Sequence, residues 1–165
     1  MSHAASGQLE DLKEKIKDVK FGMFTTLDTD GKLSSRPMTS QQLDDHGNLW
    51  FFTSDVTNFV RHLNEHPEVN VAFSDPDDSL YVSVAGHAEL TRDPAKIEEL
   101  WSPLVAAWFD GGKEDPHLSL IKVHVSGAEY WDTKSSKMTQ LYALAKSALT
   151  GKAPRDIGEH KKISL

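Results

Sequence analysis

The chain is 165 residues long and carries 18 Lys and Arg against 25 Asp and Glu, a formal net charge of −7, with no cysteine. This length suffices for one hydrophobic core, and the absence of cysteine excludes disulfides, thiolate nucleophiles and thiolate zinc sites. The negative charge argues against nucleic acid and anionic membranes as partners, because both attract cationic surfaces.

The N-terminal region is predicted to form a helix followed by two strands. The N-terminus lacks a basic and apolar secretory pattern, and no apolar stretch is long enough to span a bilayer, so we expect a cytoplasmic protein. Over residues 8–20, apolar residues recur on one helical face. Strands are predicted over 21–27 and from 32 to about 42. Pro37 inside the second strand indicates an edge or a bulge, because proline removes a ladder donor.

The next predicted strand, residues 49–53, contains Trp50, Phe51 and Phe52, and a short turn connects it to the strand that carries Arg36. We interpret the two strands as a hairpin that binds a flavin. The aromatic strand would supply an apolar wall for a flat ring, and the arginine can form two hydrogen bonds with a phosphate. The alternative from composition alone is a buried hairpin with one solvated arginine.

The second half of the chain alternates strands with short helices. Small polar residues at 54–58 are predicted to begin a short helix. Further strands are predicted over 69–73, 81–90, 118–125 and 128–131, and further helices over 93–108 and 139–149. Pro103 can break the first of these helices in two. Trp101 and Trp108 are two helical turns apart and are predicted to lie on one face, which is typical of a core or a dimer seam. We assign them to the dimer interface, with a cap over the partner's flavin as the alternative.

This order of elements favours a mainly β (β+α) fold over a parallel α/β fold: an antiparallel sheet closed into a small barrel, with short peripheral helices. No Gly-x-Gly-x-x-Gly motif or P-loop is present. The run His62-Leu63-Asn64-Glu65-His66 fits the pattern of inverted zinc peptidases. Pro67 ends that helix and no third ligand is indicated, so a solvated helix end is preferred and no metal site is expected.

Six segments of the chain share their order and spacing with one known group of proteins. They are Arg36-Pro37-Met38, Leu49-Trp50-Phe51-Phe52-Thr53-Ser54, Pro67-Glu68-Val69-Asn70-Val71, Tyr81-Val82-Ser83-Val84-Ala85-Gly86, Leu100-Trp101 and Tyr130-Trp131-Asp132. Over about residues 9–132 the chain thereby resembles the general stress protein 26 group of the pyridoxamine 5′-phosphate oxidase-like, FMN-binding split-barrel superfamily.

The resemblance implies a homodimer of six-stranded antiparallel split β-barrels of the Greek-key type, with FMN, or FAD, in two clefts at the subunit interface. It implies one flavin-binding domain over residues 1–165, with a core over about 9–132 and a C-terminal helix and tail over 133–165. The function that we expect is a flavin-dependent oxidoreductase of the general stress type, with a nicotinamide nucleotide as a candidate partner. Two alternatives stay open: a pyridoxamine or pyridoxine 5′-phosphate oxidase, and a flavin-binding or interaction module without turnover.

The resemblance also assigns cofactor contacts, but no catalytic acid or base. It places Arg36 at the phosphate. The remaining contacts are Pro37, Met38, Thr39, Ser40, Gln41, Phe51, Phe52, Thr53, Ser54, Thr57, Asn58 and, from the second subunit, Trp131.

The chain departs from the family pattern at several positions. Phe59 stands where the superfamily usually has a phosphate-binding lysine, and we expect Lys32, Arg61 or a partner residue to supply the missing cation. Tyr81 stands in place of a glutamine near the ring. Lys137 matches a substrate-binding arginine only loosely, and the tail over 151–160 does not reproduce the basic segment of the true oxidases.

Overall fold

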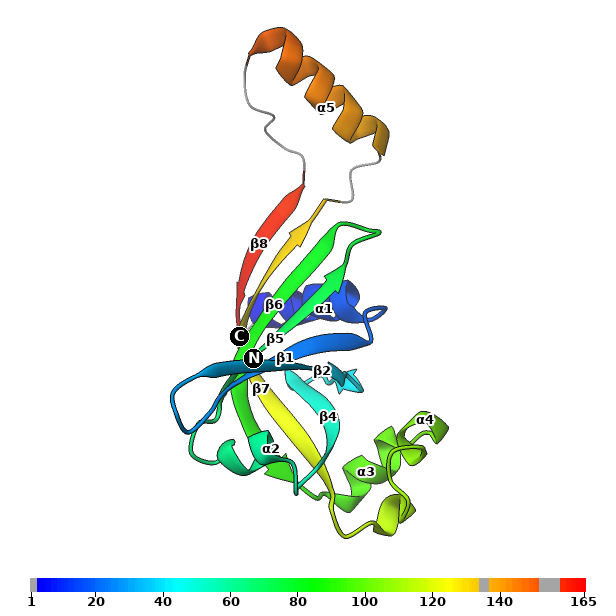
Figure 1. Cartoon of the computed structure of the whole chain (residues 1–165). Coiled ribbons are helices and arrows are strands. Elements are labelled where there is room, and N and C mark those ends of the chain that lie inside the picture. The colour runs from blue at the N-terminus through cyan, green and yellow to red at the C-terminus, as the bar shows by residue number, and fades with distance from the viewer. Residues whose placement is uncertain (1–2, 134–136, 152–157) are drawn as a thin grey trace.

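The computed structural model describes residues 3–133, 137–151 and 158–165. Its main feature is a sheet of eight antiparallel strands in the described part of the chain (Figure 1). The strands are β1 (Phe21–Leu27), β2 (Leu33–Thr39), β3 (Gln42–Leu43), β4 (Asn48–Ser54), β5 (Glu68–Asp75), β6 (Leu80–Thr91), β7 (Leu118–Asp132) and β8 (Glu159–Ser164). The expected β-dominated fold with short helices is confirmed, but the sheet has eight strands and not six.

The order of the strands explains how the sheet closes. The order is β2-β1-β5-β6-β7-β4-β3, with β8 also paired to β7. The two end strands, β2 and β3, are separated in the chain only by Ser40 and Gln41. Ser40 N donates to Lys20 O and Gln41 N donates to Trp50 O, so these two residues carry the chain from one edge to the other. The sheet must therefore curve until its edges meet, which gives a barrel that is split between β2 and β3.

β7 serves both parts of the split barrel. Its first half pairs with β4 and its second half pairs with β8. Between these halves Ser126 is an extra residue, because Val125 lies opposite Gly86 while Gly127 lies opposite Ala85. Such a β-bulge bends a strand. Gly86 permits the close approach, since a Cβ there would lie 2.5 Å from His124 O. The two predicted strands 118–125 and 128–131 are thus one bent strand.

Short helices occupy the connections between strands. They are α1 (His3–Ile16), α2 (Asn58–His62), α3 (Pro94–Leu100), α4 (Pro103–Ala106), the 3-10 helix η1 (Gly112–Glu114) and α5 (Lys137–Thr150). α1 packs against β6 and β8, whereas α5 lies beyond the ends of β7 and β8, away from the barrel (Figure 1). None of the helices in the described ranges is both long enough and apolar enough to cross a membrane.

The predicted helix over 93–108 is two helices, which changes the positions of its tryptophans. Trp101 has an extended backbone after α3, and Ser102 Oγ accepts a hydrogen bond from Val105 N to begin α4 at Pro103. Proline and a serine cap at this point start a new helix with a new axis. The prediction that Trp101 and Trp108 share one helical face is therefore wrong: Trp101 is partly buried, while Trp108 is 84% exposed.

The hydrophobic core fills the inside of the barrel. Along β1, Phe24 is fully buried while its neighbour Met23 is exposed, as a two-residue period requires. The Phe24 ring packs edge-on against Phe51, with 5.2 Å between centroids. Leu12 on α1 is fully buried on the same core. Each buried side chain of this size contributes about 1.5–3 kcal/mol to folding, so the inner face of the sheet is firmly set.

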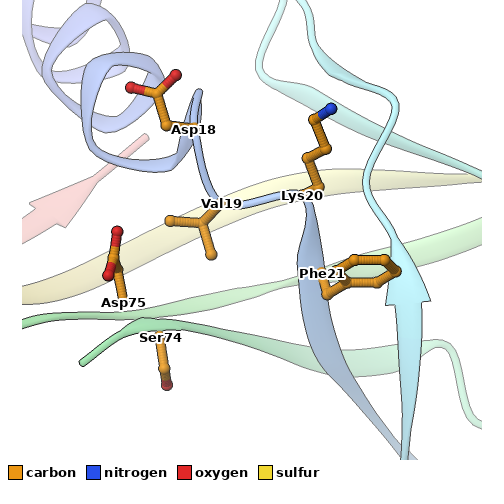
Figure 2. Close-up of a pocket in the computed structure, with 6 residues that line it drawn as sticks. All are labelled: Asp18, Val19, Lys20, Phe21, Ser74 and Asp75. Atoms are coloured by element: carbon orange, nitrogen blue, oxygen red, sulfur yellow. The ribbon is translucent and has the colours of Figure 1, made fainter. Parts of the chain in front are cut away.

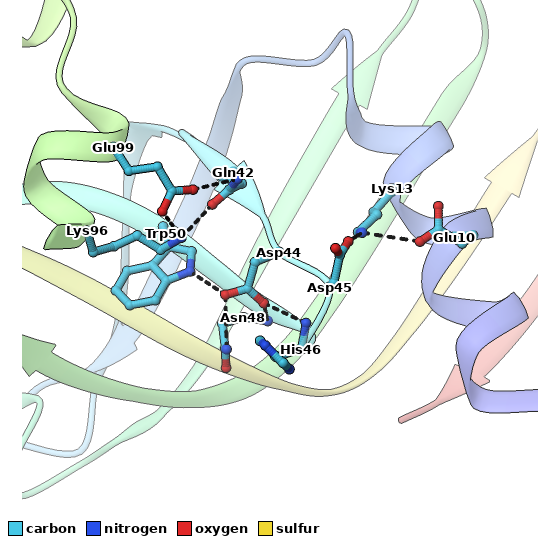
Figure 3. Close-up of polar contacts among 10 residues, drawn as sticks. All are labelled: Glu10, Lys13, Gln42, Asp44, Asp45, His46, Asn48, Trp50, Lys96 and Glu99. Atoms are coloured by element: carbon cyan, nitrogen blue, oxygen red, sulfur yellow. Dashed lines mark hydrogen bonds and ion pairs between the residues drawn. The ribbon is translucent and has the colours of Figure 1, made fainter. Parts of the chain in front are cut away.

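The turn between β3 and β4 is built around Asp44 (Figure 3). Its Oδ1 accepts hydrogen bonds from the backbone N of His46 and of Asn48, both at 2.9 Å. Its Oδ2 accepts from Asn48 Nδ2 at 3.1 Å and from Trp50 Nε1 at 2.8 Å. Lys96 on α3 lies over the Trp50 ring, 5.0 Å from its centroid. The aromatic strand β4 is thereby fixed at its start.

Candidate functional site

Arg36 lies at the centre of the predicted site, on the edge strand β2. It pairs with Phe24 across the β1–β2 ladder, so its side chain begins on the inner face of the sheet, and it is partly buried. Nη1 donates to Thr26 Oγ1 at 2.8 Å, and Nη2 donates to Ser34 Oγ at 2.6 Å and to Ser34 O at 3.1 Å. An arginine has five N–H donors, so these three hydrogen bonds leave two donors for another partner.

The guanidinium also rests on an aromatic ring. Arg36 Cζ lies 4.2 Å from the centroid of Phe59, the second residue of α2. This distance is well inside the range of a cation–π interaction. Phe59 in turn packs against Phe24, with 6.2 Å between centroids and 52° between the ring planes. The start of α2 is thus brought against β2.

The charge of Arg36 has no acidic counterpart in the described part of the chain. Burial lowers the pKa of the Arg36 guanidinium, and no carboxylate raises it. The group nevertheless stays charged at any physiological pH, because the normal pKa of arginine lies far above that range. Burial therefore costs the cation some of its hydration, and an incoming anion would restore favourable contacts.

Two of the polar residues predicted at the phosphate, Thr57 and Asn58, lie at the start of α2, directly before Phe59. Thr57 is the N-cap residue of α2, and its Oγ1 and backbone N both bond to Ser54 O. Asn58 is exposed and comes directly before Phe59. Arg36 therefore lies against Phe59, the residue that follows Asn58 in α2.

The expected hairpin between the arginine strand and the aromatic strand is wrong. β2 pairs with β1, whereas β4 pairs with β3 and β7. The chain changes edges at Ser40 and Gln41 before it turns back at Asp44, so the hairpin partner of β4 is β3. β2 and β4 meet across the split of the barrel. A sequence read locally cannot distinguish these two paths.

The predicted residues of β2 and β4 point in different directions. Met38 packs on the core, whereas Pro37 and Thr39 are exposed on the outer face. Phe51 faces the barrel interior. Thr53, at the end of β4, is also buried.

Phe52 points away from Arg36, to the opposite side of β4. Its ring packs edge-on against Trp101, with 5.8 Å between centroids, and against Phe109 at 6.4 Å. A ligand on the Arg36 side can contact the backbone of Phe52 but not its ring.

Trp131 lies far from Arg36 within one chain. It is on the outer face of β7, opposite Tyr81 on β6, and is 41% exposed. His160 on β8 stacks on it, with 5.1 Å between centroids and 9° between planes. Along the hydrogen-bonded order of the sheet, four strand-to-strand steps separate β7 from β2, about 19 Å at the usual spacing. The first half of β7 is closer to β2 through β4, but Trp131 lies on the second half, which pairs with β8. One chain alone does not bring Trp131 and Arg36 together.

A pocket of about 330 Å³ lies at the start of β1, beside the end of β5 (Figure 2). It is lined by Asp18, Val19, Lys20, Phe21, Ser74 and Asp75. None of these is among the predicted cofactor contacts. The pocket is nevertheless near one of them, because Phe21 pairs with Thr39 across the β1–β2 ladder.

The cations considered as substitutes for a lysine at position 59 are both exposed. Lys32 lies in the turn before β2. Arg61 lies four residues after Thr57, so the two share one side of α2. Lys137 is the first residue of α5, but its side chain lies outside the described residues, as do residues 152–157 of the tail.

The histidine motif is not held on one helix. α2 ends at His62, with Leu63 as its C-cap, so Glu65 and His66 lie in the turn that follows. In the described ranges, no group of three or more His, Asp and Glu lies close enough together to hold a metal ion.

Sequence reasoning missed three residues of the site. Thr26 and Ser34 accept hydrogen bonds from Arg36. Ser34 is two residues before Arg36 on the same strand, so the two-residue period of a strand places Ser34 and Arg36 on one face. The spacing of Ser34 and Arg36 could therefore have identified Ser34 from the sequence. His160 had no such signal, because the strand that carries it was not predicted.

Comparisons with known proteins agree with this fold. Residues 7–155 match the family model described as "Pyridoxamine 5'-phosphate oxidase like". A putative general stress protein 26 from Jannaschia is 31% identical, with a TM-score of 0.73 over 99% of this chain and 97% of that chain. The general stress FMN/FAD binding protein from Xanthomonas citri is 36% identical, with a TM-score of 0.68 over 79% of this chain and 92% of that chain. Protein bli-3 from Neurospora crassa is 28% identical over 95% of this chain and 79% of its own length.

Proposed function

This chain belongs to the pyridoxamine 5′-phosphate oxidase like family, and on that premise we propose that it binds a flavin nucleotide, FMN, with the phosphate at Arg36. We propose further that it acts as a flavin-dependent oxidoreductase of the general stress type, as a homodimer with a flavin at each of two equivalent interface sites. The Xanthomonas citri protein, which is 36% identical, is an FMN/FAD binding protein by its name, and this supports a flavin as the cofactor.

The observation that carries this proposal is the environment of Arg36. The guanidinium is partly buried, is oriented by Thr26, Ser34 and Phe59, and has no acidic partner among the described residues. A flavin mononucleotide phosphate is a dianion at neutral pH that accepts charge-assisted hydrogen bonds. The two unused N–H donors of Arg36 and the exposed side-chain amide of Asn58 fit such a group.

A second copy of the chain is needed to complete the site. Arg36 is directed to the inner face of the sheet, whereas Trp131 lies on the outer face of a strand four steps away. One flavin can contact both residues only if they come from two chains. Phe21, Met23 and Tyr81 are also exposed on this outer face, and exposed apolar side chains of this kind are typical of an interface.

The flavin would supply the electron transfer, and the chain would supply binding, orientation and shielding. Arg36 would hold the phosphate, and Pro37 and Thr39, both exposed on β2, would lie along the flavin. Trp131 from the partner would exclude water from one side of the ring. His160 stacks on the other face of this indole and fixes its plane.

A flavin titration tests this proposal. We expect the fluorescence of FMN to be quenched when FMN binds to the apo-protein, and Arg36→Ala to weaken FMN binding by about 1–3 kcal/mol, which is roughly 5- to 150-fold. Riboflavin lacks the phosphate, so its affinity should not change. Lys113→Ala is the matched control, because Lys113 pairs with Glu98 on the surface between α3 and η1. Equal FMN affinity in Arg36→Ala and wild type would reject the site.

Turnover is tested separately. Reduced nicotinamide nucleotide should bleach the bound flavin, and air should restore its colour. Stable yellow colour under these conditions would support flavin binding without this activity. Colourless protein that does not bind added FMN would reject flavin binding altogether.

A further inference from the structure

We propose that Phe59 is a positioning residue for the phosphate site: its ring supports the Arg36 guanidinium and sets the plane in which the cation meets the phosphate of the flavin. This inference rests on the proposed function and deepens it. It concerns a side chain that would not itself contact the phosphate through a hydrogen bond, since a phenyl ring has none to offer.

The Phe59 ring is a fixed support because it is anchored in the core. Phe59 packs against Phe24, which is fully buried and packs edge-on against Phe51. Val60, the next residue of α2, is also fully buried. Three rings therefore connect the guanidinium to the centre of the barrel, and α2 cannot shift without disturbing the core.

Two kinds of contact orient the Arg36 guanidinium: hydrogen bonds and a stacked ring. Hydrogen bonds from Nη1 to Thr26 and from Nη2 to Ser34 fix the guanidinium along its edge. The Phe59 ring, 4.2 Å from Cζ, fixes the plane. With both fixed, the remaining N–H donors, on Nε and Nη1, keep fixed directions. Less conformational entropy is then lost when an anion binds.

An aromatic support has an electrostatic consequence that a carboxylate would not have. A carboxylate would hold the arginine but would neutralise it, and the site would then attract an anion only weakly. The face of a phenyl ring attracts the cation through its quadrupole and carries no net charge. Arg36 is therefore held in place while its full positive charge stays available to the phosphate.

The same geometry explains why a cation at position 59 would not be equivalent. A lysine there would project from α2 toward a guanidinium that is already partly buried and has no acidic partner in the described part of the chain. Like charges at such short distance repel, most strongly where water is excluded. In this chain Arg36 supported by the Phe59 ring replaces the pair of cations, an arginine and a lysine, that the family pattern implies at these two positions.

The test compares FMN with riboflavin, because only FMN has the phosphate. We expect wild type to bind FMN more tightly than riboflavin. In Phe59→Leu we expect FMN affinity to fall about 2- to 30-fold, the range typical of a cation–π contact, with riboflavin affinity unchanged. Phe59→Tyr keeps the π face and should keep the wild-type ratio. Phe109→Leu is the matched control, since Phe109 packs on Trp101 and Phe52, away from Arg36.

A fluorinated ring separates electrostatics from packing. Pentafluorophenylalanine at position 59 keeps the shape of the side chain but reverses the quadrupole, so the folded protein should lose the FMN preference as Phe59→Leu does. This variant also serves if Phe59→Leu fails to fold.

The outcomes distinguish this role from the proposed function. An unchanged ratio of FMN to riboflavin affinity in the fluorinated variant, or an equal loss of both affinities in Phe59→Leu, would overturn the positioning role while leaving Arg36 as the phosphate ligand. Wild-type protein that binds neither flavin, or binds both equally, would overturn the proposed phosphate site, and the positioning role with it.

Discussion

At the scale of single residues, Asp44 shows how one carboxylate fixes the turn before the aromatic strand. Four donors converge on it: two backbone N–H groups, Asn48 Nδ2 and Trp50 Nε1. Burial raises the pKa of Asp44, but the hydrogen bonds from Trp50, Asn48 and His46 outweigh it and leave the pKa below its usual value. The ionised form of Asp44 is therefore the one that stabilises the fold.

We expect Asp44→Asn to lower the free energy of unfolding by about 1–3 kcal/mol at pH 7, because an amide cannot accept all four hydrogen bonds. A lowered pKa gives stability that is present above the unfolded pKa, about 3.9, and is lost as the pH falls through the folded pKa. The difference between wild type and Asp44→Asn in urea unfolding should therefore shrink below pH 4.

Asp45 provides the control for this prediction. Its side chain is 90% exposed and pairs with Lys13 on the surface, where ion pairs contribute little. Asp45→Asn should therefore unfold much as wild type does at pH 7. A difference between Asp44→Asn and wild type that stays constant from pH 7 to pH 3 would contradict the role given to the Asp44 carboxylate.

The residues of the site were predictable to different degrees. Arg36, Thr57 and Asn58 were predicted as cofactor contacts, and the structure places Arg36 against Phe59, the residue after Asn58. The stacking of Arg36 on Phe59 was not predicted, because the two residues are 23 positions apart by their numbers and no local pattern connects them. The position of Trp131 relative to Arg36 was also beyond the sequence, since it depends on the order of strands in the sheet.

At the scale of elements, the strands with clear alternation were predicted best. β1, β5 and β6 alternate buried and exposed side chains and were predicted to within two residues. β7 was predicted as two strands because Ser126 and Gly127 resemble a turn, whereas Ser126 is the extra residue of a bulge. β8 was missed because its sequence, Glu-His-Lys-Lys-Ile-Ser, has one apolar residue and no apolar alternation.

That one apolar residue gives the prediction for β8. Ile163 is fully buried in the core and lies opposite Ala128 on β7. We expect Ile163→Ala to destabilise the protein by about 2–5 kcal/mol, the usual cost of this truncation in a core, as measured by urea unfolding. Lys162→Ala, at the exposed neighbouring position, should have little effect. Equal stability of the two variants would mean that β8 is not part of the folded core.

At the scale of the whole molecule, the two faces of the sheet differ: one is buried in the core and the other is exposed. The inner face carries the core and directs Arg36 toward α2, whereas the outer face exposes Met23, Tyr81 and Trp131. Within one chain, Arg36 and Trp131 lie on opposite faces of the sheet. The proposed dimer follows from this separation.

A charge on the outer face should dissociate the dimer. Met23 lies between Pro37 and Ala72 on the neighbouring strands. We expect Met23→Glu to raise the dimer dissociation constant at least about 100-fold, because an unpaired carboxylate would be buried in the interface. Sedimentation velocity over a range of concentrations measures this. Leu104→Glu on α4, off the sheet, should sediment as wild type does, and an unchanged dimer in Met23→Glu would exclude this face.

Subunit mixing is the measurement that tests most directly whether Arg36 of one chain and Trp131 of the other share a flavin. Arg36→Ala and Trp131→Ala should each bind FMN weakly. After subunit exchange, each mixed dimer should contain one intact site, so roughly a quarter of all sites should regain wild-type affinity. Mixed protein that binds FMN no better than the separate variants would contradict the shared site.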